Sequence, residues 1–184
     1  MTKWMTALIA AAAMSAPASA FQGFIADYAG PVSGPVTIAE ISIGEGLLDK
    51  SDEYGAREFD RLSGTLRDDL SRELSSMGWL STDTSASALL FVTIEDATPN
   101  RPTFRQQGGP RGLDFSSYGI GGADVTAELR TPTGEVLASY SYNWSSRDIQ
   151  FAQHASTWTD AFRTFDRFST RLSESLATEA DSGM

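Results

Sequence analysis

The sequence of 184 residues contains no cysteine, and this absence removes several classes of protein at once. Without thiols the chain forms no disulfide, holds no zinc in a thiolate site and offers no cysteine for lipid attachment or nucleophilic attack. Histidine occurs once, at His154, and there is no HExxH sequence, EF-hand loop or close His/Asp cluster. The sequence therefore predicts no bound metal and no cofactor.

Positive charge is also scarce. Lys and Arg number 14 against 24 Asp and Glu, which gives a formal net charge of −10. An acidic surface of this strength repels phosphate backbones and anionic lipid headgroups, so we expect no nucleic-acid partner. A membrane span needs about 20 apolar residues, and no stretch of the chain reaches that length, so no span is expected either.

The first twenty residues carry the pattern of a secretory signal peptide. Lys3 provides a positive start, an apolar run extends from Trp4 to Met14, and Ala18-Ser19-Ala20 has the small residues of a cleavage site. We expect residues 1–20 to be removed between Ala20 and Phe21. Arginine outnumbers lysine and alanine is abundant, as in proteins from GC-rich bacterial genomes. Together with the signal peptide, this composition predicts a periplasmic or secreted protein.

Residues 21–184 have the length of one domain. An extended lead-in (21–35) comes before a strand at 36–43, whose apolar positions change parity at Ala39 and Glu40 and so predict a β-bulge. Hydrophobic periodicity then predicts a helix, a strand, a hairpin and a last helix. Their ranges are 57–77, 88–95, 125–130 with 136–144, and 158–180. This β-α-β-β-β-α order predicts an α+β two-layer sandwich, with about four mostly antiparallel strands and two long helices on one face.

Both predicted helices have one apolar stripe. The first stripe is Phe59, Leu62, Leu66, Leu70, Leu74 and Met77, and the second is Trp158, Phe162, Phe165, Leu172 and Leu176. Glu73 falls within the first apolar arc, either as a carboxylate reaching out at the helix edge or as a buried functional acid. Thr157 and Asp160 resemble a capping box.

The second helix also carries a ridge of Arg163, Arg167 and Arg171, diluted on the same face by Asp160 and Glu174. This ridge is either a mixed solvated face or a site for an acidic partner.

A long connection at 97–121 has no lasting period, and connections of this length are usually functional or disordered. It is locally basic on an acidic protein, and it interleaves arginine with aromatic residues, the types enriched at interface hot spots. We therefore expect either a disordered tether or, as the hypothesis that names a site, a partner-binding loop. Its candidate site residues are Arg101, Phe104, Arg105, Arg111, Phe115 and Tyr118.

The succession of VTIAEISI, the long helix ending at Met77-Gly78-Trp79, ASALLFVTIE, the strand pair ADVTAELRTPTGEVLASYSYNW and the last helix resembles a group of small bacterial envelope proteins. The group includes the transport-auxiliary lipoproteins, the curli-secretion channel subunit and the amino-terminal domain of TolB. The resemblance implies assembly with envelope partners and no catalytic residues. This chain departs from the group by lacking the acylated cysteine.

Together these features predict a periplasmic binding or assembly module that acts through protein–protein contacts and is not an enzyme. Two alternatives remain: a hydrolase that uses His154 or a carboxylate such as Glu73, and a structural or stress-related envelope protein. The sequence leaves the partner's identity, the pathway and the oligomeric state open.

Overall fold

The computed structural model describes residues 23–32, 34–83, 88–107, 109, 111–114 and 116–182. The predicted signal peptide, its cleavage point and Phe115 lie outside these residues. The elements in chain order are β1 (Gly23–Tyr28), β2 (Val36–Ile43), α1 (Glu45–Leu48), α2 (Ser51–Tyr54), α3 (Ala56–Ser76), β3 (Ala88–Thr98), β4 (Gly122–Arg130), β5 (Val136–Ser145), α4 (Ile149–Ala152) and α5 (Thr159–Ser182).

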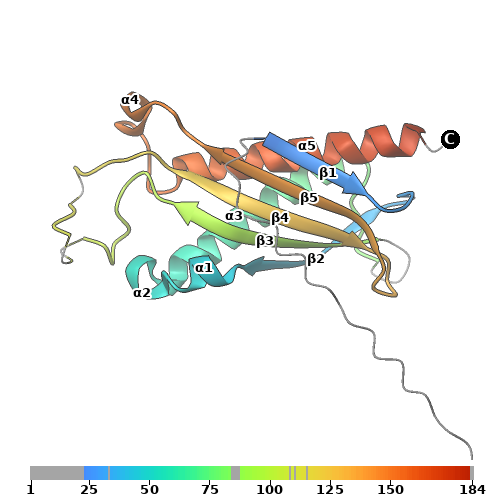
Figure 1. Ribbon diagram of the computed structural model, residues 1–184, viewed down its shortest axis with the longest axis horizontal. Coiled ribbons are helices and arrows are strands. Elements are labelled where there is room, and N and C mark those ends of the chain that lie inside the picture. Colours follow the sequence, from blue (N-terminus) through green and yellow to red (C-terminus); the bar gives the residue numbers. More distant parts are fainter. Residues whose placement is uncertain are drawn as a thin grey trace, which may run out of the picture.

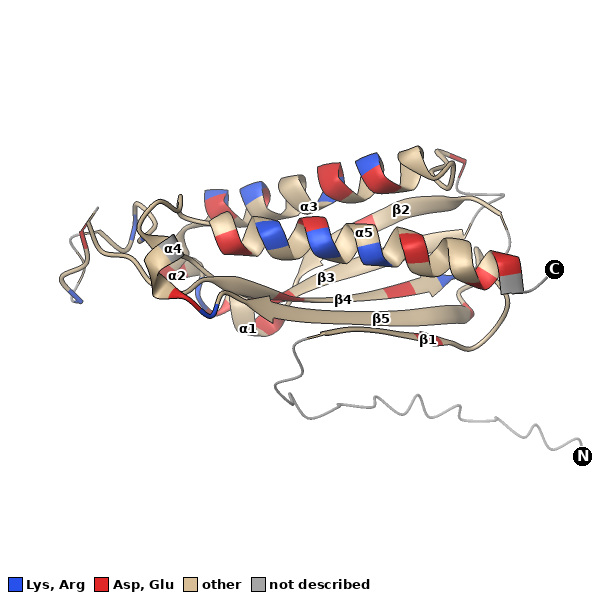
Figure 2. Cartoon of the chain, turned by 90° about the horizontal axis from the view of Figure 1, so that it is seen from above, with Lys and Arg blue, Asp and Glu red and all other residues tan. Residues whose placement is uncertain are grey.

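The strands form one five-stranded sheet in the order β1-β5-β4-β3-β2 (Figure 1). Strands β2 and β3 are parallel and joined through α3, and the other neighbouring pairs are antiparallel. The long helices α3 and α5 lie side by side on the same face of the sheet (Figure 2). These observations confirm the α+β two-layer sandwich with a mostly antiparallel sheet.

The fifth strand, β1, lies in the segment for which the sequence predicted only an extended lead-in. It pairs with β5 from Gly23↔Asn143 to Tyr28↔Ala138 and forms one edge of the sheet. The hydroxyl of Tyr28 is hydrogen-bonded to Ser175 Oγ of α5 at 2.7 Å. A six-residue edge strand has little periodicity of its own, so its partner strand determines that it forms.

The core lies between the sheet and the two long helices. Leu62, Leu66, Leu70 and Leu74 of α3 are fully buried, and so are the aromatic rings of Trp158, Phe165 and Phe168, which are three of the largest buried side chains. The apolar stripes therefore face the sheet, as predicted. Met77 is the exception: it follows the end of α3 and is exposed, because the chain turns away at Gly78, whose φ is 72°.

Several boundaries differ from the sequence prediction. Strand β3 continues to Thr98 and buries Ala97, so the long connection covers 99–121 and not 97–121. The polar stretch at 44–55 contains the short helices α1 and α2. The predicted bulge is confirmed by the register shift between Ile38 and Glu40. The hairpin turn is confirmed as well, since Gly134 N donates to Thr131 O at 2.9 Å.

Candidate functional site

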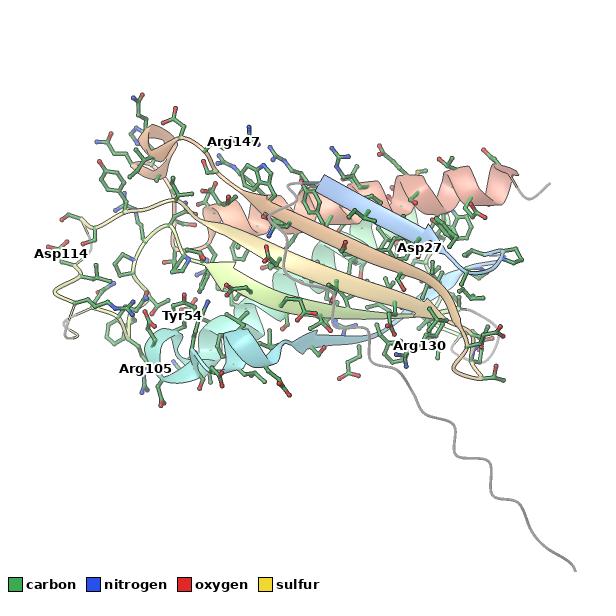
Figure 3. The ribbon with its side chains drawn as sticks, viewed as in Figure 1. Asp27, Tyr54, Arg105, Asp114, Arg130 and Arg147 are labelled. Atoms are coloured by element: carbon green, nitrogen blue, oxygen red, sulfur yellow. The ribbon has the colours of Figure 1, made fainter. Side chains whose placement is uncertain are left out.

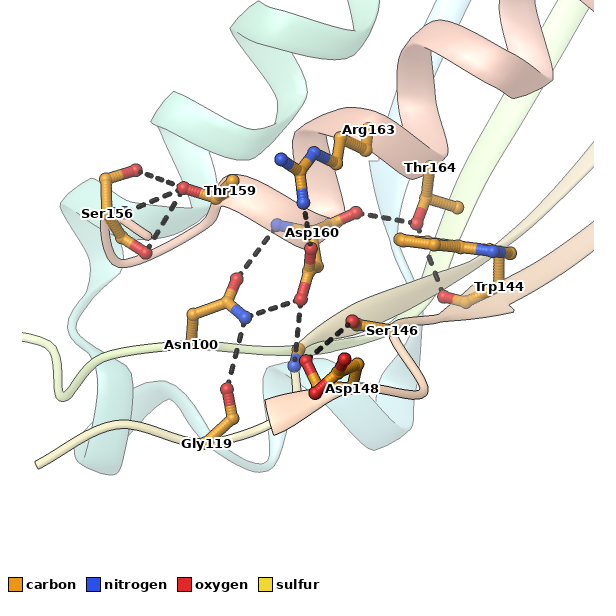
Figure 4. A network of polar contacts seen from close by, with 11 residues as sticks. Asn100, Gly119, Trp144, Ser146, Asp148, Ser156, Thr159, Asp160, Arg163 and Thr164 are labelled. Atoms are coloured by element: carbon orange, nitrogen blue, oxygen red, sulfur yellow. Dashed lines mark hydrogen bonds and ion pairs between the residues drawn. The ribbon is translucent and has the colours of Figure 1, made fainter. Parts of the chain in front are cut away.

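The two ends of the long loop are fixed to the domain by Asn100 (Figure 4). Its side chain is almost fully buried, and its Oδ1 accepts from the backbone N of Asp160 at 2.8 Å. Its Nδ2 donates to Asp160 Oδ2 at 2.5 Å and to Gly119 O at 3.2 Å. A loop residue therefore satisfies a free N–H in the first turn of α5 and also joins the loop's beginning to its end.

Asp160 is the acceptor at the centre of this network, with a side chain only 3% exposed. Besides Asn100, it receives the backbone N of Gly121 at 3.4 Å and Arg163 Nη1 at 2.9 Å. Gly121 is required by this close approach, because a Cβ there would stand 2.6 Å from Asn100 Oδ1. Several donors thus compensate the burial of one carboxylate.

The predicted capping box of Thr157 and Asp160 is wrong by position. Helix α5 begins at Thr159, whose Oγ1 accepts from the backbone N of Ser156 at 2.7 Å. Asp160 is thereby free to bond with Asn100, a residue 60 positions away that local sequence patterns do not reveal.

The loop arginines donate mainly to oxygens of the domain. Arg101 donates to Ala155 O at 2.6 Å and to Gln153 O at 2.5 Å. Arg105 Nε donates to Asp52 O at 3.2 Å, and Arg111 Nη1 contacts Glu53 Oε1 at 2.6 Å. The described part of the loop is therefore docked on two sides, against α2 and against the segment after α4.

The structure brings most of the predicted loop residues together in two hollows. Arg105 and Arg111 line a hollow of about 350 Å³ beside α2, and Arg101, Arg111 and Tyr118 line a neighbouring one of about 260 Å³. Phe104 lines neither hollow and is 83% exposed. Phe115 lies outside the described residues, so its place in this surface stays a prediction.

Local hydrogen bonding and burial shift two pKa values at this end of the molecule. Hydrogen bonds from the side chain and backbone of Ser116, with further ones from Ser117, lower the pKa of Asp114 at the outer end of the loop (Figure 3). Burial, with added repulsion from Glu53 and Asp96, raises the pKa of Tyr54 to about 12. Tyr54, which lines the smaller hollow, is therefore harder to ionise than a free tyrosine.

A further hollow of about 1010 Å³ forms a groove between α5, the start of β1 and the end of β5. Arg167 stacks on Trp144, with its Cζ 4.2 Å from the ring centroid, and the Cζ of Arg171 is 6.0 Å from the ring centroid of Tyr142. We call this surface the arginine groove. Its lining residues are Gly23, Phe24, Tyr142, Trp144, Ser145, Ser146, Arg147, Asp148, Arg163, Arg167 and Arg171.

Sequence analysis found the arginine ridge of α5 but not its aromatic floor. Tyr142 and Trp144 belong to β5, and only the packing of α5 on β5 places them beneath the arginines. The sequence pattern that could have revealed this floor is the alternation of side chains along β5. Tyr142 and Trp144 lie on the same face of that strand as the buried Ala138 and Tyr140. A helix packed over that side necessarily brings its own edge residues to these rings.

The two residues considered for catalysis, His154 and Glu73, line neither the loop hollows nor the arginine groove. His154 is exposed in the turn after α4, and Glu73 accepts from Arg72 Nε at 3.1 Å at the edge of α3. Arg72 also reaches Asp69 at 2.7 Å and Asp166 of α5 at 2.9 Å, so Glu73 belongs to an ion-pair network between the helices. Across the described ranges, no group of three His, Asp or Glu side chains has the geometry to hold a metal ion.

The fold defines this chain as a small α+β two-layer domain. No family model and no curated protein matches it. Among solved structures, it is similar to the PelC dodecamer from Paraburkholderia phytofirmans, at 13% identity in two structures. These matches cover 82% and 80% of this chain and 97% and 95% of the PelC chains, with TM-scores of 0.45 and 0.41.

A minor lipoprotein from Acinetobacter baumannii is also similar, at 15% identity and a TM-score of 0.34, over 80% of this chain and 94% of that chain. At these identities and TM-scores no functional property carries over from the neighbours. No helix in the described part of the chain is long and apolar enough to cross a membrane.

Proposed function

We propose that this protein is exported to the cell envelope and acts there as a binding or assembly module without catalysis, contacting a partner protein through its long loop. The contacting surface, which we call the loop surface, consists of Phe104, Arg105, Arg111 and Tyr118. The observation that carries the proposal is Phe104, a large apolar ring left 83% exposed on a loop whose ends are fixed by buried hydrogen bonds.

A docked loop suits binding better than a free tether does. Ordering a flexible segment at an interface costs free energy, and a loop already held by Asn100 and Arg101 avoids much of that cost. Aromatic and arginine side chains are also the residues that most often dominate interface energies. Tyr118, which is 46% exposed, is a second exposed aromatic side chain of the same loop.

Site-specific photocrosslinking in intact cells tests the loop surface. A photoreactive amino acid at position 104 should give one discrete crosslinked product, whereas the same amino acid at Ile25 should give none. Ile25 is a matched control, because it is an exposed apolar residue (51%) on the distant edge strand β1. Products of equal yield from both positions would contradict a specific loop contact.

A second measurement separates contact from proximity. With the photoreactive group at Tyr118, Phe104→Ser should reduce the yield of the product, and His154→Ala should leave it unchanged.

Mass spectrometry of the native protein should find Phe21 at the amino terminus, and a retained Met1 would contradict export by signal-peptide cleavage.

A further inference from the structure

The arginine groove concentrates positive charge on a strongly acidic chain. Four of the 14 basic residues of the sequence, Arg147, Arg163, Arg167 and Arg171, line this one hollow, together with a single acid, Asp148. Three of the four lie on α5 at intervals of four residues, so they follow one side of the helix. A row of this kind is a surface for a negatively charged ligand.

Two of these arginines contact aromatic rings and form no ion pair within the described residues. The guanidinium of Arg167 lies over the ring of Trp144, with its Cζ 4.2 Å from the centroid, and that of Arg171 lies 6.0 Å from the centroid of Tyr142. No carboxylate of the described residues lies within ion-pair distance of either guanidinium. Stacking occupies the flat face of a guanidinium and leaves its N–H groups, which lie in the plane, available to donate. Arg167 is thus preorganised for a bidentate bond to a carboxylate group, and Arg171 lies one helical turn further along the same groove.

We propose that the arginine groove binds a short acidic peptide segment of another protein in extended conformation. Residues four apart on an α-helix are separated by about 6.0 Å along its axis. Alternate side chains of an extended peptide are separated by about 6.6 Å. Carboxylates at every second position of an extended segment therefore match Arg163, Arg167 and Arg171 in turn.

Other anionic ligands fit the groove less well. The net charge of −10 repels a membrane surface or a nucleic acid, both of which extend well beyond the groove, whereas a short segment contacts the groove alone. An acidic polysaccharide would bind by stacking its sugar rings on aromatic faces. Here the guanidinium group of Arg167 already lies over the ring of Trp144, and Tyr142 is buried.

The inference is tested by fluorescence anisotropy with the full chain and a dye-labelled peptide of alternating glutamate and threonine. The matched probe has glutamine in place of each glutamate. The glutamate peptide should bind and lose affinity as salt is raised, and the glutamine peptide should bind at least about tenfold more weakly. Equal binding of the two peptides would overturn the proposal.

Variants of the chain locate the binding. The double variant Arg167→Gln/Arg171→Gln should weaken the glutamate peptide at least about tenfold, because it removes two charged donors. Arg57→Gln/Arg67→Gln makes the same charge change at exposed positions of α3 and should alter binding by less than about twofold. An equal loss from both variants would reduce the effect to overall charge and overturn the groove as the site.

A third probe distinguishes the ligand class. An oligogalacturonate of the same charge should bind the groove more weakly than the peptide does, and stronger binding would overturn the choice of a peptide. Since Phe104 lies outside the groove, Phe104→Ser should leave peptide binding unchanged. Failure of the groove test is therefore distinguishable from failure of the loop surface.

Discussion

Two sets of arginines in this molecule look alike in the sequence and differ in the structure. Arg101, Arg105 and Arg111 of the loop donate to backbone carbonyls or to Glu53. Arg167 and Arg171 of α5 lie over aromatic rings, which accept no ordinary hydrogen bond from their N–H edges. The loop arginines therefore use some of their N–H groups within the domain, whereas those of Arg167 and Arg171 remain available to a partner.

The difference separates stability from binding. The loop arginines attach a long connection to the domain, so replacing them should affect folding as well as recognition. Arg167 and Arg171 of the groove hold no other element through an ion pair in the described structure, so replacing these two should affect recognition alone. The following four tests, in order of expected size, sharpen or break this division.

The largest effect should come from the core that both regions share. Phe165→Ala in α5 should lower the free energy of unfolding by about 3–5 kcal/mol, and Leu70→Ala in α3 by about 2–5 kcal/mol, because both side chains are fully buried. Urea denaturation measures both values. A loss of less than about 1 kcal/mol at either position would mean that the region does not depend on this core.

Asn100→Ala should cost about 2–4 kcal/mol of unfolding free energy. The substitution removes a helix cap and leaves the carboxylate of Asp160 buried with fewer donors. Ser116→Ala, at an exposed position of the same loop, is the control and should cost less than about 0.5 kcal/mol. For the same reason, replacing 99–121 with a short Gly-Ser connection should destabilise the domain, and unchanged stability would make the loop an appendage.

Single arginine variants compare the two sets directly. Arg101→Ser should cost about 1–2 kcal/mol, since its guanidinium donates to two carbonyls. Arg111→Ser should cost less than about 1 kcal/mol, because its side chain is 71% exposed and its ion pair is screened by solvent. Arg167→Ser should cost less than about 0.5 kcal/mol. The order Arg101, Arg111, Arg167 in urea denaturation is the prediction, and a reversed order breaks the comparison.

The smallest effects on stability should come from two acidic residues, for which the local surroundings determine whether the pKa rises or falls on folding. Burial, followed by repulsion from Asp96, raises the pKa of Asp124 in the folded state. A carboxyl whose pKa is raised on folding destabilises the protein above that pKa, and the penalty disappears as the pH falls below the unfolded value of about 3.9. Asp124→Asn should therefore raise the thermal midpoint at pH 7 but not near pH 3.

Asp114 provides the opposite case, because hydrogen bonds lower its pKa in the folded state. Its contribution is stabilising above the unfolded value of about 3.9 and is lost as the pH falls through the folded pKa. Asp114→Asn should lower the thermal midpoint slightly at pH 7. The same direction of change for both variants would contradict this assignment of the two pKa shifts.

The sequence predicted the elements whose periodicity is internal to them. Both long helices, the bulge in β2 and the hairpin of β4 and β5 follow from the spacing of apolar residues and from turn chemistry, which neighbouring positions determine. Strand β1 did not follow, because a short edge strand becomes a strand only by pairing with β5.

For the loop surface, the sequence predicted which residue types a partner would contact. It did not predict the hydrogen-bond and ring partners of these or other site residues within the chain. The bond between Asn100 and Asp160 spans 60 positions, and Arg167 lies over a ring 23 positions earlier in the chain. The α+β class that the resemblance to envelope proteins implies agrees with the structure, and the role that it implies stays a prediction.

By itself, the sequence determined the α+β class, the inward faces of the helices, the acidic net charge and the types of residue offered to a partner, because composition and local spacing control these properties. Only the tertiary structure decided which charges remain available. Whether an arginine meets a carbonyl, a carboxylate or an aromatic ring depends on segments that are distant in the chain and adjacent in space. That is why Arg101 serves the fold of this protein while Arg167 is left for a ligand.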